Sequence, residues 1–376
     1  MNTLASGIEL LRPPVIEFGA GRIGALAQWI AARRIRRTLV VAGGFNAGRV
    51  GQLGLSGDVA VFGGVAPEPD VPCLDAAVAV ARGFAPDLVI GLGGGSAMDV
   101  AKLVAVLVDG RQTLGEIAGP EKVLGRSVAL AQVATTAGTG SEVGTRALVT
   151  DLVTRNKIAV QSRFMLADIA IVDPELMRSV PPQITAETGV DAMAHCVEAY
   201  TNIKAHPIID HYALEGARLV GRYLKRAVTD GNDTEARAGL ALASLYGGIC
   251  LGPVNTAGGH AIAYPLGTRH KIAHGAANAV IFPHVLAYNA AVVADKTAAV
   301  LGALGVAASS DPDAVLASAH GYCAGLGIEM RMSRRGVPED DLPAMADEAF
   351  AIKRLIDNNP RPLTREAILE IYRRAY

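Results

Sequence analysis

The hydrophobic pattern of the chain changes near Val180, and this change limits the possible folds more than any other feature. Before it, short runs of β-branched residues alternate with stretches of helical pattern. The predicted strands span residues 38–42, 59–62, 87–91, 128–133 and 169–172, with helices such as 73–82 and 96–108 between most of them. This alternation is typical of a parallel sheet covered by helices.

From Pro181 onward the pattern is helical. Apolar residues recur three and four positions apart, and the predicted helices include 185–200, 211–227 and 234–250. A chain of 376 residues is also long enough to form two cores. We therefore predict a parallel-sheet α/β domain over residues 1–180, followed by an all-helical domain over residues 181–376.

Composition argues against several classes of partner and site. The 35 Lys and Arg against 36 Asp and Glu give a net charge of −1, without a basic block that could bind a nucleic-acid backbone. No run approaches the roughly twenty apolar residues of a membrane span, and the N-terminus lacks a signal-peptide pattern. The four cysteines form no CxxC pair, and Cys196 is expected to be a buried apolar residue. We expect a cytoplasmic protein with neither nucleic-acid nor membrane partners.

Two glycine-rich segments follow predicted strands. Residues 91–96 (GLGGGS) lie between a strand and a helix, where backbone amides and a helix N-terminus can approach a phosphate. Their spacing matches neither G-x-G-x-x-G nor a P-loop, so a plain tight turn is the alternative. Residues 135–142 (TTAGTGSE) follow another strand. Because open sheets bind ligands at the carboxyl ends of their strands, the two segments together predict a nucleotide site.

Four residues of the helical half form a candidate metal site. Asp191 and His195 are spaced i, i+4, which places a carboxylate and an imidazole on one helix face. His260 and His274 flank residues 261–273, a stretch with a proline and glycine that we expect to form a loop bringing the imidazoles together. One carboxylate and three histidines suit Zn²⁺ or Fe²⁺. Taken singly, each histidine is more often a hydrogen-bonded polar residue, so the prediction rests on the set.

These motifs, in this order, resemble the iron-containing alcohol dehydrogenase family, also called group III. They are GGGSAMDVAK (93–102), TTAGTGSE (135–142), TAETGVDAMAHCVEAY (185–200) and GHAIAYPLGTRHKIAHG (259–275). The similarity extends from about Pro13 to Asn289. It implies a Rossmann-like dinucleotide-binding domain, an all-helical metal-binding domain, and a homodimer or larger homo-oligomer.

The resemblance also implies roles for individual residues. The metal, Fe²⁺ or Zn²⁺, would be held by Asp191, His195, His260 and His274. The cofactor, NAD or NADP, would contact residues of the first half, namely Gly94, Gly95 and Ser96 at the diphosphate, and then Asp99, Thr135, Thr136 and Thr139. Lys157 matches a family lysine that lies near the nicotinamide ribose.

The sequence departs from the family pattern in three places. The first nucleotide strand runs into Gly43, with no carboxylate where NAD-preferring members often carry one, so NADP is also admissible. Tyr264 replaces an additional histidine of many members, and it either takes part at the reacting centre or only packs. Arg146 falls among substrate-side residues, and His270 lies in a basic stretch between two metal ligands. The guanidinium of an arginine can form two hydrogen bonds to the carboxylate, phosphonate or sulfonate of a substrate. The alternative is that these basic residues only form surface salt bridges.

We therefore predict a metal-dependent, NAD(P)-linked alcohol dehydrogenase or aldehyde reductase with a small substrate, for which an anionic group is one option. Two alternatives stay open. One is a non-redox enzyme resembling dehydroquinate synthase, which pairs similar domains. The other is a metal-dependent hydrolase whose glycine loops bind a phosphorylated substrate. Only the dehydrogenase gives a net change in nicotinamide absorbance.

Overall fold

The computed structural model describes residues 4–154 and 156–376, which form two compact units. The α/β unit comprises Leu10–Thr136 and Gly140–Arg178. The helical unit comprises residues 4–9, Ala137–Thr139 and Ser179–Tyr376. All strands that the structure describes lie in the α/β unit. The domain boundary near Val180 remains a proposal.

The α/β unit is built on a six-stranded sheet in which all neighbouring strands are parallel. Its strands, in spatial order, are β1 (Val15–Phe18), β9 (Ile169–Val172), β6 (Ala129–Ala134), β4 (Leu88–Gly93), β2 (Arg37–Ala42) and β3 (Asp58–Phe62). The five predicted strands are all present. The sequence pattern misses β1, because four residues with a glutamate among them carry little signal.

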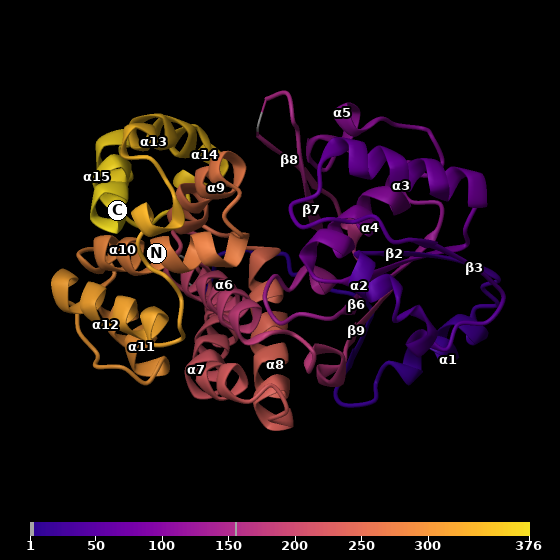
Figure 1. Cartoon of the computed structure of the whole chain (residues 1–376), viewed down its shortest axis with the longest axis horizontal. Helices are drawn as coiled ribbons and strands as arrows, with labels where there is room; N and C mark the ends of the chain where they lie inside the picture. Colours follow the sequence, from indigo (N-terminus) through magenta and orange to yellow (C-terminus); the bar gives the residue numbers. More distant parts are fainter. Residues whose placement is uncertain (1–3, 155) are drawn as a thin grey trace. The chain divides into compact units, whose positions relative to one another are not determined.

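Helices flank the sheet (Figure 1), and each of its faces has its own apolar core. The helices of the unit are α1 (Gly24–Ala32), α2 (Gly44–Ala47), α3 (Val71–Phe84), α4 (Gly95–Leu107) and α5 (Leu114–Ile117). Leu39 and Val41 of β2 pack in one apolar cluster with α3 and α4, whereas Val40 lies in another with Trp29 and Ile30 of α1. Because successive side chains of a strand point to opposite sides, β2 supplies apolar residues to the cores on both faces of the sheet.

A small second sheet belongs to the same unit. Its strands, in spatial order, are β5 (Gly119–Pro120), β8 (Lys157–Gln161) and β7 (Arg146–Thr150), with β7 antiparallel to β8. The sequence pattern does not predict this sheet, since its strands are short and no helix separates β7 from β8. Two candidate residues, Arg146 and Lys157, begin β7 and β8.

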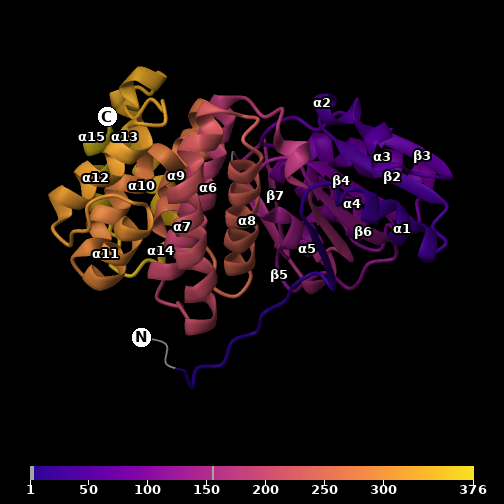
Figure 2. The same cartoon turned by 90° about the horizontal axis from the view of Figure 1, so that it is seen from below.

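The helical unit has two apolar cores. Its helices are α6 (Pro182–Thr201), α7 (Pro207–Thr229), α8 (Thr234–Leu251), α9 (Gly258–His270), α10 (His274–Ala290), α11 (Ala294–Ala303), α12 (Pro312–Ala324), α13 (Leu342–Ala351), α14 (Lys353–Ile356) and α15 (Arg365–Ala375). One core joins α10, α11 and α12 to α6, α7 and α8, which lie side by side (Figure 2). The other core joins α9 and α10 to α13, α14 and α15. Within residues 4–154 and 156–376, no helix is both long and apolar enough to span a membrane.

The prediction that residues 261–273 form a loop is wrong. The chain up to His270 belongs to α9, which accommodates Pro265 in its interior. Pro265 removes one backbone hydrogen bond, but Ile262 and Leu266 are fully buried in the core shared with α13 and α15. Burial of a large apolar side chain contributes about 1.5–3 kcal/mol, which offsets the lost bond.

Candidate functional site

Helix α6 carries two of the candidate metal ligands. It has a proline in its first turn, where the missing N–H costs little because that position has no intrahelical partner. Asp191 and His195 follow one turn apart, and both are buried. This spacing places their side chains on one helix face, with Asp191 Oδ1 3.8 Å from His195 Nε2.

The other two candidate ligands come from consecutive helices. His260 lies in the first turn of α9, and His274 is the first residue of α10. Between them Lys271 adopts a left-handed conformation, with φ of 56°, that ends α9, and its N–H donates to the carbonyl of Gly267. A helix followed by a tight turn therefore brings the two imidazoles together, in place of the predicted loop.

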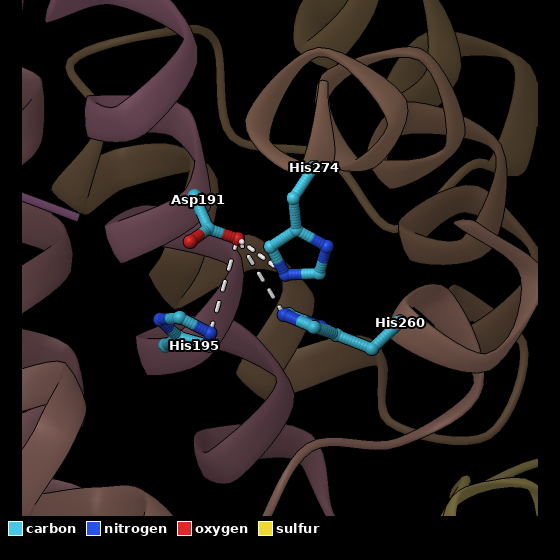
Figure 3. A group of neighbouring side chains, drawn as sticks. All are labelled: Asp191, His195, His260 and His274. Carbon is cyan, nitrogen blue, oxygen red and sulfur yellow. Dashed lines mark ion pairs between the residues drawn. The ribbon is translucent and has the colours of Figure 1, made fainter. Parts of the chain in front are cut away.

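The four side chains converge on one point (Figure 3). Asp191 Oδ1 lies 3.6 Å from Nε2 of His260 and 3.5 Å from Nε2 of His274. The ligand atoms of Asp191, His195, His260 and His274 all lie within 4.8 Å of one another. Donor atoms about 2.0–2.2 Å from a shared ion are separated by roughly 3–4 Å. The cluster therefore has the size of a divalent metal site.

Hydrogen bonds behind the cluster orient two of the imidazoles. His260 Nδ1 lies 2.8 Å from Glu198 Oε1, and His195 Nδ1 lies 3.3 Å from the carbonyl oxygen of Gly138. Both partners are acceptors, so in the neutral imidazoles Nδ1 carries the proton and Nε2 presents a lone pair to the centre. Glu198 can come this close because Gly259 has no side chain; a Cβ there would collide with Glu198 Oε1.

The electrostatics of the cluster favour a bound cation. Burial lowers the pKa of His195 to about 4, so this imidazole is neutral at pH 7. Burial also acts on His260, but the carboxylates of Glu198 and Asp191 outweigh it and raise the pKa of His260 to about 10. Burial disfavours ionised Asp191, yet the neighbouring histidines hold its pKa below the ordinary value. The two buried carboxylates thus favour a positive charge here, either a proton on His260 or a metal ion.

Asn278 contacts three of the four candidate metal ligands. Its Nδ2 lies 2.6 Å from Asp191 Oδ1 and 3.2 Å from Nε2 of both His260 and His274. Its Oδ1 is buried and has no hydrogen-bond partner among the described residues. The Asn278 amide has two N–H groups, which cannot satisfy three acceptor atoms. The acceptor atoms of Asp191, His260 and His274 therefore lack a cation between them. The residues therefore fit a divalent metal, and their oxygen and imidazole donors suit iron or zinc.

Tyr264 lies beside the cluster, whereas His270 faces an acid. The ring of Tyr264 is 5.9 Å from the ring of His274. His270 Nε2 lies 3.3 Å from Asp341 Oδ2. Of these two substrate-side candidates, Tyr264 is the one that contacts a candidate metal ligand.

The first glycine loop begins α4 in the α/β unit. Gly94 precedes the helix, and Gly95 and Ser96 are its first two residues, so N–H groups of this turn lack intrahelical partners. A Cβ on Gly94 would lie 2.9 Å from Thr136 Oγ1, so only glycine allows this close approach. The loop and Thr136 lie at the carboxyl ends of β4 and β6, where parallel sheets bind ligands.

A partly buried hydrogen-bond network ties α4 to the second glycine segment. Ser141 Oγ donates to Asp99 Oδ1 at 2.6 Å, and Lys102 Nζ donates to Ser141 Oγ at 2.6 Å and to the Arg146 carbonyl at 2.8 Å. Asp99 Oδ2 accepts from the Leu148 N–H at 3.0 Å. Both oxygens of Asp99 are thus used within the protein, and its contact with a cofactor remains a proposal.

The end of β2 is joined to the second glycine segment. Gly43 follows the strand directly and precedes α2. Asn46 of α2 donates through Nδ2 to Thr135 Oγ1 at 3.2 Å. Gly43 and Thr135 therefore belong to one hydrogen-bonded region at the carboxyl edge of the sheet.

Three residues of the second glycine segment cluster with the helical unit. They are Ala137–Thr139, and in their middle the Gly138 N–H donates to Ser244 Oγ at 2.8 Å. The carbonyl of Gly138 is the group that faces His195. Thr139, a candidate cofactor contact, therefore follows directly on a residue that orients a candidate metal ligand.

Arg146 and Lys157 both have protein partners. Arg146 Nη2 donates to Gln161 Oε1 at 2.9 Å on the neighbouring strand. Lys157 forms an ion pair with Glu68. Their roles at substrate and nicotinamide ribose remain proposals.

Both halves of the chain match one known family. Residues 13–174 match the family described as iron-containing alcohol dehydrogenase, and residues 185–376 match the C-terminal region of the Fe-containing alcohol dehydrogenase family. The chain belongs to the iron-containing alcohol dehydrogenase family. It is an NAD-linked, metal-dependent oxidoreductase of the alcohol dehydrogenase class.

Relatives of this iron-containing alcohol dehydrogenase cover most of its length. Long-chain-alcohol dehydrogenase 1 of Geobacillus thermodenitrificans (strain NG80-2) is 39% identical over 326 residues, which are 85% of this chain and 82% of the relative. A crystal structure of 1,3-propanediol oxidoreductase aligns with a TM-score of 0.92 and 31% identity, over 99% of this chain and 100% of that one. Sulfoacetaldehyde reductase from Bifidobacterium kashiwanohense, in complex with NAD⁺, aligns with a TM-score of 0.88 and 28% identity over 99% of both chains. These matches confirm the predicted family and fold.

Two residues beside the candidate metal ligands of this iron-containing alcohol dehydrogenase are not predicted from the sequence. Glu198 lies three residues after His195 on α6, and Asn278 lies four residues after His274 on α10. Both spacings place the residue on the same helix face as a candidate ligand. That spacing is the sequence signal by which both residues could be found.

Proposed function

We propose that this enzyme interconverts a small alcohol and the corresponding aldehyde, with Asp191, His195, His260 and His274 as the ligands of an iron or zinc ion. The observation that carries the proposal is the convergence of four donor atoms within 4.8 Å of one another. When bound there, the metal supplies Lewis acidity, which stabilises negative charge on the oxygen of the alcohol or aldehyde.

Hydrogen bonds within the protein orient the candidate metal ligands without a bound ion or substrate. Glu198 and the carbonyl of Gly138 hold two imidazoles with Nε2 inward, so binding of an ion requires little reorganisation. Asp191, His195 and His260 are buried, so their charges and dipoles act in a region from which water is excluded.

We propose that NAD or NADP, which supplies the hydride acceptor or donor, binds the α/β unit. The first turn of α4 offers N–H groups to the diphosphate, through Gly94, Gly95 and Ser96. The other proposed contacts are Gly43, Asp99, Thr135, Thr136, Thr139 and Lys157. Gly43 carries no charge that would repel a 2′-phosphate, so NADP is admissible beside NAD.

On the substrate side we propose a small molecule that contacts Tyr264, because this residue borders the ligand His274. The Bifidobacterium relative is a sulfoacetaldehyde reductase, and sulfoacetaldehyde is an anionic aldehyde. An anionic group on the substrate of this chain is therefore part of the proposal. Arg146 of the α/β unit is one candidate for binding this anionic group. His270 of the helical unit is a weaker candidate, because Asp341 faces it.

The test is a panel of short alcohols and aldehydes, assayed with both nicotinamide cofactors after metal-depleted protein has been loaded with Fe²⁺ or Zn²⁺. We expect one nicotinamide to be oxidised or reduced for each substrate converted, and only in metal-loaded protein. A cyclase resembling dehydroquinate synthase would return NAD unchanged, and a metal-dependent hydrolase would not need it. Conversion of substrate without a net nicotinamide change would refute the proposal.

A further inference from the structure

One of the four candidate metal ligands is much more exposed than the others. The side chains of Asp191, His195 and His260 are 2–5% exposed, whereas that of His274 is 27% exposed. His274 is therefore the candidate ligand most open to a small molecule. The residues that border His274 are in a position to select it.

Two successive ring contacts link His274 to Tyr264 and Tyr264 to Arg354. The ring of Tyr264 is 5.9 Å from the His274 ring, and the guanidinium carbon of Arg354 lies over the Tyr264 ring, 5.7 Å from its centre. The second distance lies within the range of cation–π contacts. Tyr264 is buried, whereas Arg354 is exposed, so the guanidinium is available to an anion.

The backbone that carries Arg354 is firmly anchored. Asn358 Nδ2 donates to the carbonyl of Arg354 at 3.0 Å and to the carbonyl of Thr256 at 2.9 Å, which ties α14 to the segment before α9. The next residue, Leu355, is fully buried. The position of the arginine is thus set by the core, although its head group is in solvent.

Two other arginines of the surrounding helices are paired with acids. Arg269, at the end of α9, donates to Glu348 at 2.9 Å, and Arg365 of α15 is paired with Asp347. For Arg354, by contrast, no carboxylate lies within 4.0 Å in the part of the chain that the structure describes. Arg354 therefore offers an unneutralised positive charge to an anion that binds near Tyr264.

We infer that Arg354 binds the anionic end of the substrate, and that the substrate is a short aldehyde or alcohol with a terminal carboxylate, sulfonate or phosphonate. A guanidinium fork makes two parallel hydrogen bonds to such a group. The sum of the two distances above is the greatest possible separation of its carbon from the His274 ring centre, and this sets an upper limit on the length of the substrate. The inference rests on the proposed function, because the reacting carbon must lie at the metal cluster.

The test compares a series of ω-carboxylated aldehydes of increasing length with neutral aldehydes of equal carbon number. The variants are Arg354→Ala and Arg354→Lys, with Lys353→Ala as a matched control that removes a neighbouring exposed charge. We expect Arg354→Ala to lower kcat/KM about 10- to 100-fold for the anionic aldehydes, the scale of a charge-assisted hydrogen-bonded pair, and to leave the neutral ones within about threefold. Lysine, which keeps the charge and loses the fork, should lie between. Lys353→Ala should not lower kcat/KM selectively for either class of aldehyde.

A second measurement tests binding without turnover. Calorimetry on metal-loaded protein without cofactor should show weaker binding of a short ω-hydroxy carboxylate to Arg354→Ala by a similar factor, and unchanged binding to Lys353→Ala. Equal losses on anionic and neutral aldehydes would overturn the inference, as would a selective loss in Arg146→Ala that Arg354→Ala does not share. In both cases the dehydrogenase proposal would stand. Absence of nicotinamide-linked turnover of every aldehyde by the unaltered enzyme would instead refute the proposed function.

Discussion

The carboxylate of Glu198 lies 2.8 Å from His260 Nδ1 and also accepts the backbone N–H of His260 at 3.1 Å. It accepts the N–H of Ala257 as well, so one buried acid from α6 caps the N-terminus of α9 and orients the imidazole that follows. The geometry of a candidate ligand and the start of its helix thus depend on a single side chain.

Replacing Glu198 by glutamine should weaken metal binding about 10- to 100-fold, as found when the hydrogen-bond partner of a ligand is altered. Glutamine keeps the shape and an acceptor oxygen but loses the charge behind His260. Competition with a chelator measures the affinity. Glu187→Gln is the control, because Glu187 is a second buried acid of α6 that accepts from Gln183. Unchanged affinity in Glu198→Gln would show that this carboxylate does not support the ligand.

His260→Ala should lose the metal and all turnover, because three donors remain and the Glu198 carboxylate is left buried without its imidazole. NAD binding should stay within about threefold of the original, since the proposed cofactor contacts lie elsewhere in the chain. Elemental analysis and cofactor titration give the two readings. His211→Ala, which alters an exposed histidine outside the cluster, is the control. Near-normal activity of metal-loaded His260→Ala would remove His260 from the ligand set.

Glu142 should make the α/β unit less stable as pH rises. Burial raises its pKa to about 7, although its own backbone N–H and Lys102 act in the opposite direction. In the unfolded chain the pKa is 4.5, so between these values the folded protein holds a proton that the unfolded chain has lost. Stability therefore falls from about pH 4.5 to 7, and this group adds no further change above that.

Glu142→Gln removes this effect. The free energy of unfolding of the variant, relative to the original, should rise by roughly 1–3 kcal/mol between about pH 5 and pH 8. The single tryptophan, Trp29, lies in α1 of the same unit, so its fluorescence during urea unfolding reports the correct transition. A difference that stays constant with pH would contradict the raised pKa.

Gly43→Asp should shift the enzyme toward NADH, because a carboxylate at the end of β2 repels a 2′-phosphate. We expect the ratio of kcat/KM for NADPH to that for NADH to fall at least about tenfold relative to Gly43→Asn. Asparagine is the matched control, since the Cβ of either residue meets the Val65 carbonyl at 3.0 Å and only the charge differs. Equal ratios in the two variants would place the adenosine ribose away from Gly43.

Local pattern predicts most of the secondary structure, because β2, β4 and the long helices α6 to α8 each carry a clear period. It also predicts the four candidate ligands, whose residue types and spacing are distinctive. The helical state of residues 261–270 cannot be predicted locally, since the proline signal is outweighed by burial of Ile262 and Leu266. The partnership of Glu198 with His260 spans 62 residues of sequence, and that of Arg354 with Tyr264 depends on a four-residue helix, so both arise only from tertiary packing.

The clustering of Ala137–Thr139 with the helices has a consequence for chimaeras between relatives. A hybrid joined at Val180 would take His195 and Ser244 from one parent and the peptide groups of Gly138 that hold them from the other. Any mismatch in that tripeptide would then appear as poor metal retention rather than as poor cofactor binding. Swaps of the helical half should therefore carry residues 137–139 along with residues 179–376.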